Sequence, residues 1–198
     1  MGAPPREDPG VQLMLAFQAG QEGAFTELVQ AYQGAVFSML RRLLGPHPMV
    51  EDLAQETFVR LYRARERYRP EGRLATFLFR ITYNLALNRV RDDRRRETSS
   101  LGAGGEDGAR EPRDERVPGP GEALDRETWA RRIETALAAL PENQRAALVF
   151  QHYQGLDLAE IGAILGISAK AVKSLLHRAR ENLRPILAPY REEEGEGR

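Results

Sequence analysis

The chain has 198 residues, of which 41% are hydrophobic and 29% charged, and it contains no cysteine. This length suffices for one or two small globular domains, and the lack of cysteine excludes disulfide frameworks, thiolate zinc sites, iron–sulfur clusters and cysteine nucleophiles. The longest uninterrupted apolar stretches, 136–140 and 146–150 among them, have five residues each, whereas a membrane helix needs about 20. The sequence therefore predicts no membrane insertion and, because its start lacks the apolar segment of a secretory signal, a cytoplasmic protein.

The 29 basic and 29 acidic residues balance over the whole chain but are segregated along it. Residues 1–96 carry a net charge of +4, residues 97–124 a net charge of −4, and residues 125–198 are neutral. Of the basic residues 27 are arginine, and the two lysines, Lys170 and Lys173, lie three positions apart. Overall neutrality therefore does not exclude a nucleic-acid partner.

The first part of the chain is predicted to be helical, because its apolar residues recur at helical rather than strand spacing. A short amphipathic lead-in spans 11–19, a long helix ends at the Gly-Pro-His-Pro turn 45–48, and two further helices run from about 50 to 67 and from about 74 to 94. The residues expected on their buried faces are Phe25, Leu28, Val29, Tyr32, Val36, Met39, Leu40 and Leu43, then Leu53, Thr57, Phe58, Leu61 and Tyr62, then Leu74, Phe77, Leu78, Ile81 and Leu85.

A linker is predicted after these helices. The stretch 97–124 has six glycines, three prolines, no aromatic residue and no apolar periodicity, so it cannot bury enough apolar surface to offset the entropy of ordering. We therefore expect an all-α fold of two small helical domains, over 1–96 and 124–187, joined by a flexible acidic linker over 97–123 and followed by an acidic tail over 188–198. The acidic segments are hypothesised to screen the basic faces in the free protein.

The second domain is predicted to contain a helix-turn-helix. A helix that carries Trp129, Ile133 and Leu137 stops at Pro141, and another follows over about 142–153. The sequence Asp157-Leu158-Ala159-Glu160 has the form of a capping box that starts a helix. Gly166 suits the left-handed residue of a tight turn, Ser168 suits the cap of the last helix, and Gly162 permits the two helices to cross closely.

The last helix is amphipathic in a way that fits the major groove of DNA. Val172, Leu175, Leu176, Ala179 and Leu183 share its apolar face, and a cationic, hydrogen-bonding face lies opposite. Lysine and arginine reach guanine edges or phosphates, and serine contacts base or backbone. The residues predicted to bind the duplex are Ser168, Lys170, Lys173, Ser174, His177 and Arg178. A merely solvated face is the alternative, and three histidines without cysteine argue against a metal site.

Four stretches of the sequence resemble the extracytoplasmic-function (ECF) sigma factors of the sigma-70 family. They are AFTELVQAY, VEDLAQETFVRLYRA, LATFLFRITYNLALNRVR and LPENQRAALVFQHYQGLDLAEIGAILGISAKAVKSLLHRAREN, within about 12–96 and 124–186. The resemblance implies a factor that binds core RNA polymerase, recognises the minus-thirty-five and minus-ten elements of promoters and promotes strand opening, with no enzymatic activity and no cofactor. The chain departs from the usual family pattern at Phe77, Tyr83 and Asn88.

The resemblance also implies partners and further site residues. The partners are the polymerase core, through its β′ coiled coil and β flap, promoter DNA and an anti-sigma factor. The residues that correspond to the core-docking face are Asp52, Gln55, Glu56, Val59 and Arg63. Those that correspond to the minus-ten strand and its backbone are Tyr68, Arg80, Tyr83, Asn84, Asn88 and Arg91.

Two other functions remain open at this stage. A one-component regulator would share the helix-turn-helix, bind a small ligand through the first domain and bind an operator as a dimer. An all-helical enzyme would use the helix-turn-helix for packing only, but the sequence offers no convergent group of carboxylates, nucleophiles or metal ligands for it.

Overall fold

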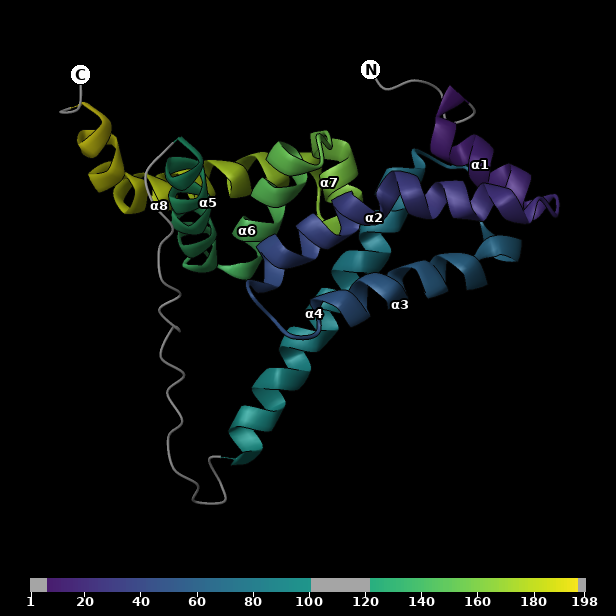
Figure 1. Cartoon of the computed structure of the whole chain (residues 1–198), viewed down its shortest axis with the longest axis horizontal. Coiled ribbons are helices and arrows are strands. Elements are labelled where there is room, and N and C mark those ends of the chain that lie inside the picture. The colour runs from purple at the N-terminus through teal and green to yellow at the C-terminus, as the bar shows by residue number, and fades with distance from the viewer. Residues whose placement is uncertain (1–6, 101–121, 196–198) are drawn as a thin grey trace.

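The structure of the chain is a computed structural model that describes residues 7–100 and 122–195. Within these ranges it is helical and contains no strand, which confirms the predicted all-α class. The elements, shown in Figure 1, are α1 (Pro9–Gln18), α2 (Glu22–Leu44), α3 (Val50–Arg63), the 3-10 turn η2 (Arg65–Arg67), α4 (Leu74–Ser100), α5 (Glu122–Ala138), α6 (Glu142–Leu148), the π-helical turn η3 (Val149–Tyr153), α7 (Leu158–Leu165) and α8 (Ala169–Gly195).

The first unit, α1 to α4, is built around one apolar core. The side chains of Phe17, Leu28, Met39, Leu61 and Leu78 are fully buried in it, and they come from all four helices. Asp8 starts α1, because its carboxylate accepts a hydrogen bond from the Val11 backbone N–H at 2.9 Å.

The predicted buried faces of the first unit agree with the core, with one exception. Tyr62 of α3 was expected to face inward but is 45% exposed. Its ring lies at the edge of the core, with its centroid 5.1 Å from those of both Phe17 and Phe25. An aromatic residue with a polar hydroxyl can contribute one face to packing while the other stays in water.

The second unit comprises α5 to α8. Its core includes Leu137, Phe150, Ile161, Val172 and Leu176, all of which are buried. The helix expected over about 142–153 exists, but its second half is the π-helical turn η3, which sequence periodicity does not distinguish from α-helix. Most of the predicted linker, 101–121, lies outside the described residues, and its two ends belong to α4 and α5.

The two units pack against each other, with α5, α6, η3 and α7 lying along α2 and α4 (Figure 1). We call this packing the closed arrangement. The Tyr83 ring of α4 meets the Phe150 ring of η3 with their centroids 5.6 Å apart. The guanidinium of Arg145 donates hydrogen bonds across the interface to the Leu43 carbonyl at 2.7 Å and within its own unit to the Ala138 carbonyl at 2.9 Å. Aromatic packing and charge-assisted hydrogen bonds therefore both hold the interface.

Candidate nucleic-acid interface

The helix-turn-helix forms as the sequence predicts. The Asp157 carboxylate accepts hydrogen bonds from the backbone N–H groups of Ala159 and Glu160, at 2.8 and 2.9 Å. The Glu160 carboxylate in turn accepts one from the Asp157 N–H at 3.0 Å, which completes the capping box at the start of α7. Gly166 ends α7 in the left-handed conformation, with φ 70° and ψ 31°.

Gly162 allows α7 and the turn to approach more closely than any side chain would permit. A Cβ atom at this position would lie 2.6 Å from the carbonyl oxygen of Ile167. The Ile167 backbone N–H donates to the Gly162 carbonyl at 3.0 Å, so the two backbones are joined where the methyl group would intrude. This contact sets the direction in which α8 leaves the turn.

The predicted duplex-binding face of α8 is exposed to solvent. Lys170, Lys173, Ser174, His177 and Arg178 are all exposed, and Ser168 is exposed immediately before the helix begins. On the opposite side Val172, Leu176 and Ala179 are buried against the rest of the unit.

Both serines of this face also make local hydrogen bonds. The Ser168 hydroxyl accepts from the Ala171 N–H at 3.2 Å, and the Ser174 hydroxyl donates to the Lys170 carbonyl at 3.3 Å. A hydroxyl has one donor and two acceptor sites, so each keeps capacity for a further partner.

A second polar face runs along α4. Arg80, Asn84, Asn88 and Arg91 are exposed, and at 100° per residue they fall within 80° of one another on the helix surface. We call these four residues the α4 stripe. The ring of Phe77 lies next to its first member, with the Arg80 guanidinium carbon 5.6 Å from the ring centroid. Cations and amides thus follow one side of the helix, beginning at an aromatic ring.

The two tyrosines predicted for the strand site are buried in the closed arrangement. Tyr83 is 6% exposed, and its hydroxyl donates to the Asn143 side-chain oxygen of α6 at 3.3 Å. Burial, followed by the negative charge of Glu142, raises the pKa of Tyr83. Neither its ring nor its hydroxyl can reach a nucleic acid unless the second unit moves away.

Tyr68, in the segment between η2 and α4, is 3% exposed. Its ring packs edge-on against Phe77 at a centroid distance of 5.3 Å. Burial, with smaller contributions from Asp8 and Tyr32, raises the pKa of Tyr68 to about 12. Its hydroxyl has no hydrogen-bond partner within the described part of the chain.

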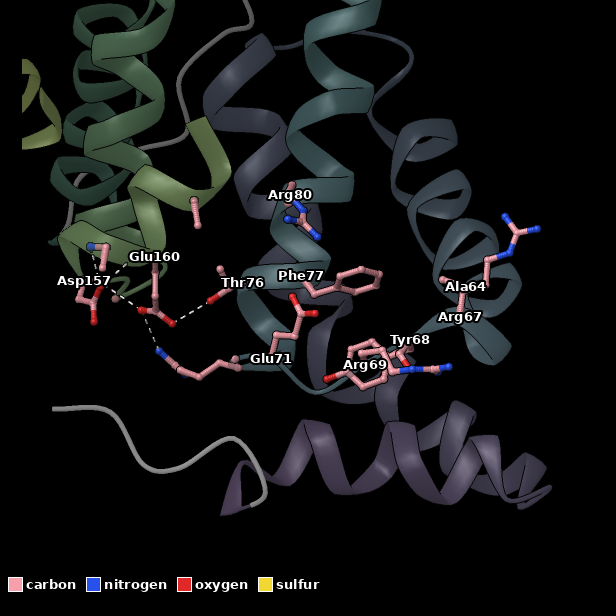
Figure 2. A pocket seen from close by; sticks show the side chains of 15 residues that line it. Ala64, Arg67, Tyr68, Arg69, Glu71, Thr76, Phe77, Arg80, Asp157 and Glu160 are labelled. Atoms are coloured by element: carbon pink, nitrogen blue, oxygen red, sulfur yellow. Dashed lines mark hydrogen bonds and ion pairs between the residues drawn. The ribbon is translucent and has the colours of Figure 1, made fainter. Parts of the chain in front are cut away.

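A cleft of about 860 Å³ separates the start of α4 from the start of α7, and Tyr68 and Phe77 line it (Figure 2). The first unit contributes four arginines to its walls, and the second unit contributes Asp157 and Glu160. The Glu160 carboxylate accepts a hydrogen bond from the Thr76 hydroxyl of α4 at 2.8 Å. The sequence predicts Glu160 only as part of the capping box of α7. Its contact with Thr76 could not be predicted, because the two residues lie 84 positions apart and no local pattern links them.

The predicted core-docking face lies on α3 and is open to solvent. Asp52, Gln55, Val59 and Arg63 are exposed, and Val59 is 40% exposed at the centre of the face. Glu56 is half-buried and pairs with Arg60 at 2.8 Å. An exposed apolar residue ringed by charges is an arrangement that protein interfaces use.

Two further classes of site find no support among the described residues. No three of their His, Asp and Glu side chains are grouped so that they could hold a metal ion. None of the helices in 7–100 or 122–195 is both long and apolar enough to cross a bilayer.

Two family models match the chain, Sigma-70 region 2 over residues 28–96 and Sigma-70 region 4 over residues 130–183. The ECF RNA polymerase sigma factor SigE of Mycolicibacterium smegmatis is 37% identical over 170 residues, which cover 86% of this chain and 64% of that protein. The ECF RNA polymerase sigma factor SigW of Bacillus subtilis is 30% identical over 170 residues, 85% of this chain and 91% of the relative.

Solved structures share the fold. CnrH in complex with the cytosolic domain of CnrY superimposes with a TM-score of 0.67 at 24% identity, over 89% of this chain and 96% of that chain. The sigma factor RpoE from Bartonella quintana, in complex with the anti-sigma factor NepR, gives a TM-score of 0.64 at 24% identity, over 83% of this chain and 96% of that chain.

An exposed cationic helix-turn-helix face and a second exposed polar face, on two helical units, are typical of a DNA-binding protein. The chain belongs to the ECF RNA polymerase sigma factors, whose regions 2 and 4 correspond to its first and second units. The predictions of an ECF-type sigma factor and of a transcription initiation factor rather than an enzyme are thereby confirmed, and the one-component regulator is not favoured.

Proposed function

We propose that the chain gives core RNA polymerase its promoter specificity by holding two DNA elements at once. The exposed face of α8 binds the minus-thirty-five duplex, and the α4 stripe binds the minus-ten strand once it is opened. The observation that carries this proposal is the presence, in one chain, of two separate exposed faces of different chemistry. The face of α8 is cationic and hydrogen-bonding, whereas the stripe adds two amides and begins at an aromatic ring.

The face of α8 suits double-stranded DNA. A helix of a helix-turn-helix enters the major groove with its first residues against the base edges. Lys170, Lys173 and Ser174 lie at the start of α8, and Ser168 immediately precedes it. His177 and Arg178, one turn later, contact base edges or the flanking phosphates. Lysine and arginine prefer guanine O6 and N7, so we expect guanine in the bound element.

The α4 stripe suits single-stranded DNA. Asn84 and Asn88 can read the exposed edges of unpaired bases, Arg80 and Arg91 can pair with phosphates, and the Tyr68 ring can stack on an extruded base. Tyr68 is buried within the first unit, beside Phe77. Tyr83 is covered by Phe150 and Asn143 of the second unit, so its access to the strand requires the second unit to leave α4. Single-stranded contacts of this kind contribute about 1 to 3 kcal/mol per base.

The energies require the polymerase as a partner. Opening about ten base pairs costs roughly 14 kcal/mol if stacking contributes about 1.4 kcal/mol per step, and two captured bases return less than half of that. We therefore propose that the exposed face of α3 docks on the β′ coiled coil and that the second unit contacts the β flap. We also propose that the chain works in the cytoplasm, where polymerase and chromosomal DNA are found.

An anti-sigma factor is the proposed regulator. RpoE of Bartonella quintana was solved with the anti-sigma factor NepR, and its fold resembles that of this chain. We propose that a partner of this class binds the chain and blocks its docking on core polymerase.

Run-off transcription with purified core polymerase on fragmented genomic DNA, followed by sequencing of the 5′ ends, tests the proposal. We expect start sites that share a minus-thirty-five and a minus-ten element and that appear only when the chain is added. The Val59→Glu variant should lose core binding in a pull-down assay, while the exposed change Glu27→Gln on α2 should not. Footprints on specific DNA without polymerase, together with no effect on start-site choice, would instead indicate a one-component regulator.

A further inference from the structure

The carboxylate of Glu160 bridges the two units at the edge of the cleft. One oxygen accepts the hydrogen bond from the Thr76 hydroxyl at 2.8 Å, and the other lies 3.6 Å from a guanidinium nitrogen of Arg73. Figure 2 shows this carboxylate directed from α7 toward α4, where Thr76 meets it. The Glu160 side chain is 17% exposed and that of Arg73 is 42% exposed. The Glu160 carboxylate of the second unit is thus held by the Arg73 guanidinium and the Thr76 hydroxyl of the first unit.

The charges that line the cleft are divided between the units. The first unit contributes four arginines, Arg67, Arg69, Arg73 and Arg80, against the single acidic residue Glu71. The two other acidic residues, Asp157 and Glu160, come from the second unit. When the second unit is absent, the remaining wall is therefore strongly cationic around the aromatic rings of Tyr68 and Phe77. Cations that follow a backbone beside rings that stack on bases are the composition of single-strand binding sites.

We propose that Arg73 and Thr76 form a binding site for a backbone phosphate of the opened promoter strand, and that Glu160 occupies this site in the closed arrangement. The inference rests on the proposed function and extends it to two residues outside the α4 stripe. A guanidinium and a hydroxyl that hold a carboxylate can hold a phosphate oxygen in the same way, with charge-assisted hydrogen bonds. Glu160 and the strand then compete for the same donors.

This competition couples strand binding to the arrangement of the units. A strand phosphate can take the site only after Glu160 has left it, so strand binding and the closed arrangement exclude each other. A partner that holds the two units together therefore lowers the affinity of the chain for the strand. By thermodynamic reciprocity, the strand lowers the affinity of the chain for that partner by the same factor.

The test measures binding of the full chain to fluorescein-labelled oligo(dT) of about ten nucleotides by fluorescence anisotropy, over a series of salt concentrations. Oligo(dT) is suitable because phosphate contacts do not depend on sequence. The Glu160→Gln variant removes the negative charge but keeps the capping box, in which glutamine serves as well as glutamate. The Glu27→Gln variant makes the same change of net charge at an exposed position on α2 and is the matched control.

We expect Glu160→Gln to raise the affinity for oligo(dT) about threefold, the size of effect that a partly exposed ion pair supports, and Glu27→Gln to raise it less. Arg73→Ala should lower the affinity about fivefold at 0.1 M salt and reduce the slope of log K against log salt by about 0.7, as loss of one phosphate contact predicts. In the Arg73→Ala background, Glu160→Gln should no longer have an effect beyond that of the control.

A second variant covers the case in which Arg73→Ala perturbs folding, since Arg73 also lies 3.8 Å from Asp8. Thr76→Val keeps the shape of the side chain and removes only the hydroxyl, and it should weaken oligo(dT) binding while far-UV circular dichroism stays unchanged. An oligomer of the same sequence with a neutral methylphosphonate backbone should bind wild type and Arg73→Ala equally.

Two results would overturn the inference. One is an equal effect of Glu160→Gln and Glu27→Gln on oligo(dT) binding, and the other is an unchanged affinity and salt slope in both Arg73→Ala and Thr76→Val. Failure of the proposed function is distinguishable, because it would appear as a wild-type chain that does not bind core polymerase or direct start sites. If wild type directs start sites and the Arg73 and Thr76 variants match it in oligo(dT) binding, only the present inference is wrong.

Discussion

Replacing Gly162 with alanine tests whether the close approach inside the helix-turn-helix positions α8 for DNA. The new Cβ would lie 2.6 Å from the Ile167 carbonyl oxygen, closer than van der Waals contact permits, and the obstacle is backbone rather than a flexible side chain. The backbone must therefore shift, and α8 must turn with it. Gly34→Ala in α2 is the matched control, because a Cβ there meets nothing within 4 Å.

The magnitude follows from comparing the two variants. Alanine in place of glycine inside a helix stabilises by about 0.5 to 1 kcal/mol through the lower entropy of the unfolded chain, and this gain applies to both positions. Inserting a methyl group into a close-packed contact costs about 1 to 3 kcal/mol, and this cost applies to Gly162 alone. The free energies of unfolding of the two variants should thus differ by about 1 to 3 kcal/mol, with Gly34→Ala the more stable.

Urea denaturation followed by far-UV circular dichroism gives the stability difference, and anisotropy with a labelled minus-thirty-five duplex gives the binding. We expect Gly162→Ala to lose duplex affinity even under conditions where it remains folded, and Gly34→Ala to bind as wild type does. Equal stability and equal duplex affinity of the two variants would refute the reasoning that Gly162 sets the direction of α8.

Three further predictions follow from other parts of the structure. Lys170→Ala or Lys173→Ala should weaken initiation from minus-thirty-five-dependent promoters by about 1 to 3 kcal/mol if the lysines read bases, measured by run-off transcription on several promoters; equal losses on every promoter would indicate phosphate contacts. Arg145→Met should lower the free energy of unfolding by about 1.5 to 3 kcal/mol, because the carbonyls near the ends of α2 and α5 lose a charged donor; a change in the urea midpoint too small to resolve would contradict this. The pKa of Tyr68 is raised to about 12 in the folded chain. Tyr68 should therefore contribute about 2 to 3 kcal/mol of stability that is fully present below pH 10 and is lost as pH rises toward 12. The Tyr68→Phe variant should lose this part of the alkaline pH dependence of unfolding, and an unchanged profile would argue against burial of the hydroxyl.

Local sequence signals predicted the helix-turn-helix in detail. The capping box of Asp157 and Glu160 makes both of its hydrogen bonds, and Gly166 takes the left-handed conformation. The backbone of the turn approaches Gly162 closely, as predicted, because a Cβ atom there would lie 2.6 Å from the Ile167 carbonyl oxygen. Each of these features depends on residues fewer than six positions apart, and over such distances the backbone conformation is dictated by the residue types themselves.

Features that depend on distant residues were not predictable in this way. Periodicity placed Tyr83 on α4 but could not reveal that Phe150 and Asn143 cover it. The same holds for Glu160, whose contact with Thr76 joins the two units. The π-helical turn η3 was also missed, because an extra residue in a helical turn leaves no mark in a short apolar pattern. The identities of the site residues for DNA and core polymerase stay predictions until the variants are measured.

The closed arrangement leaves the face of α8 accessible while it covers Tyr83 with Phe150 and Asn143. A bacterial cell contains a large excess of messenger RNA and other unpaired strands, which would compete for any permanently open surface that stacks on bases. With that ring enclosed, we expect the unbound protein to avoid sequestration by transcripts while the face of α8 stays open to chromosomal duplex. Selectivity for promoter DNA would then begin before any base is read, because the duplex-binding face of α8 is available first and the strand-binding surface becomes available only after the units separate.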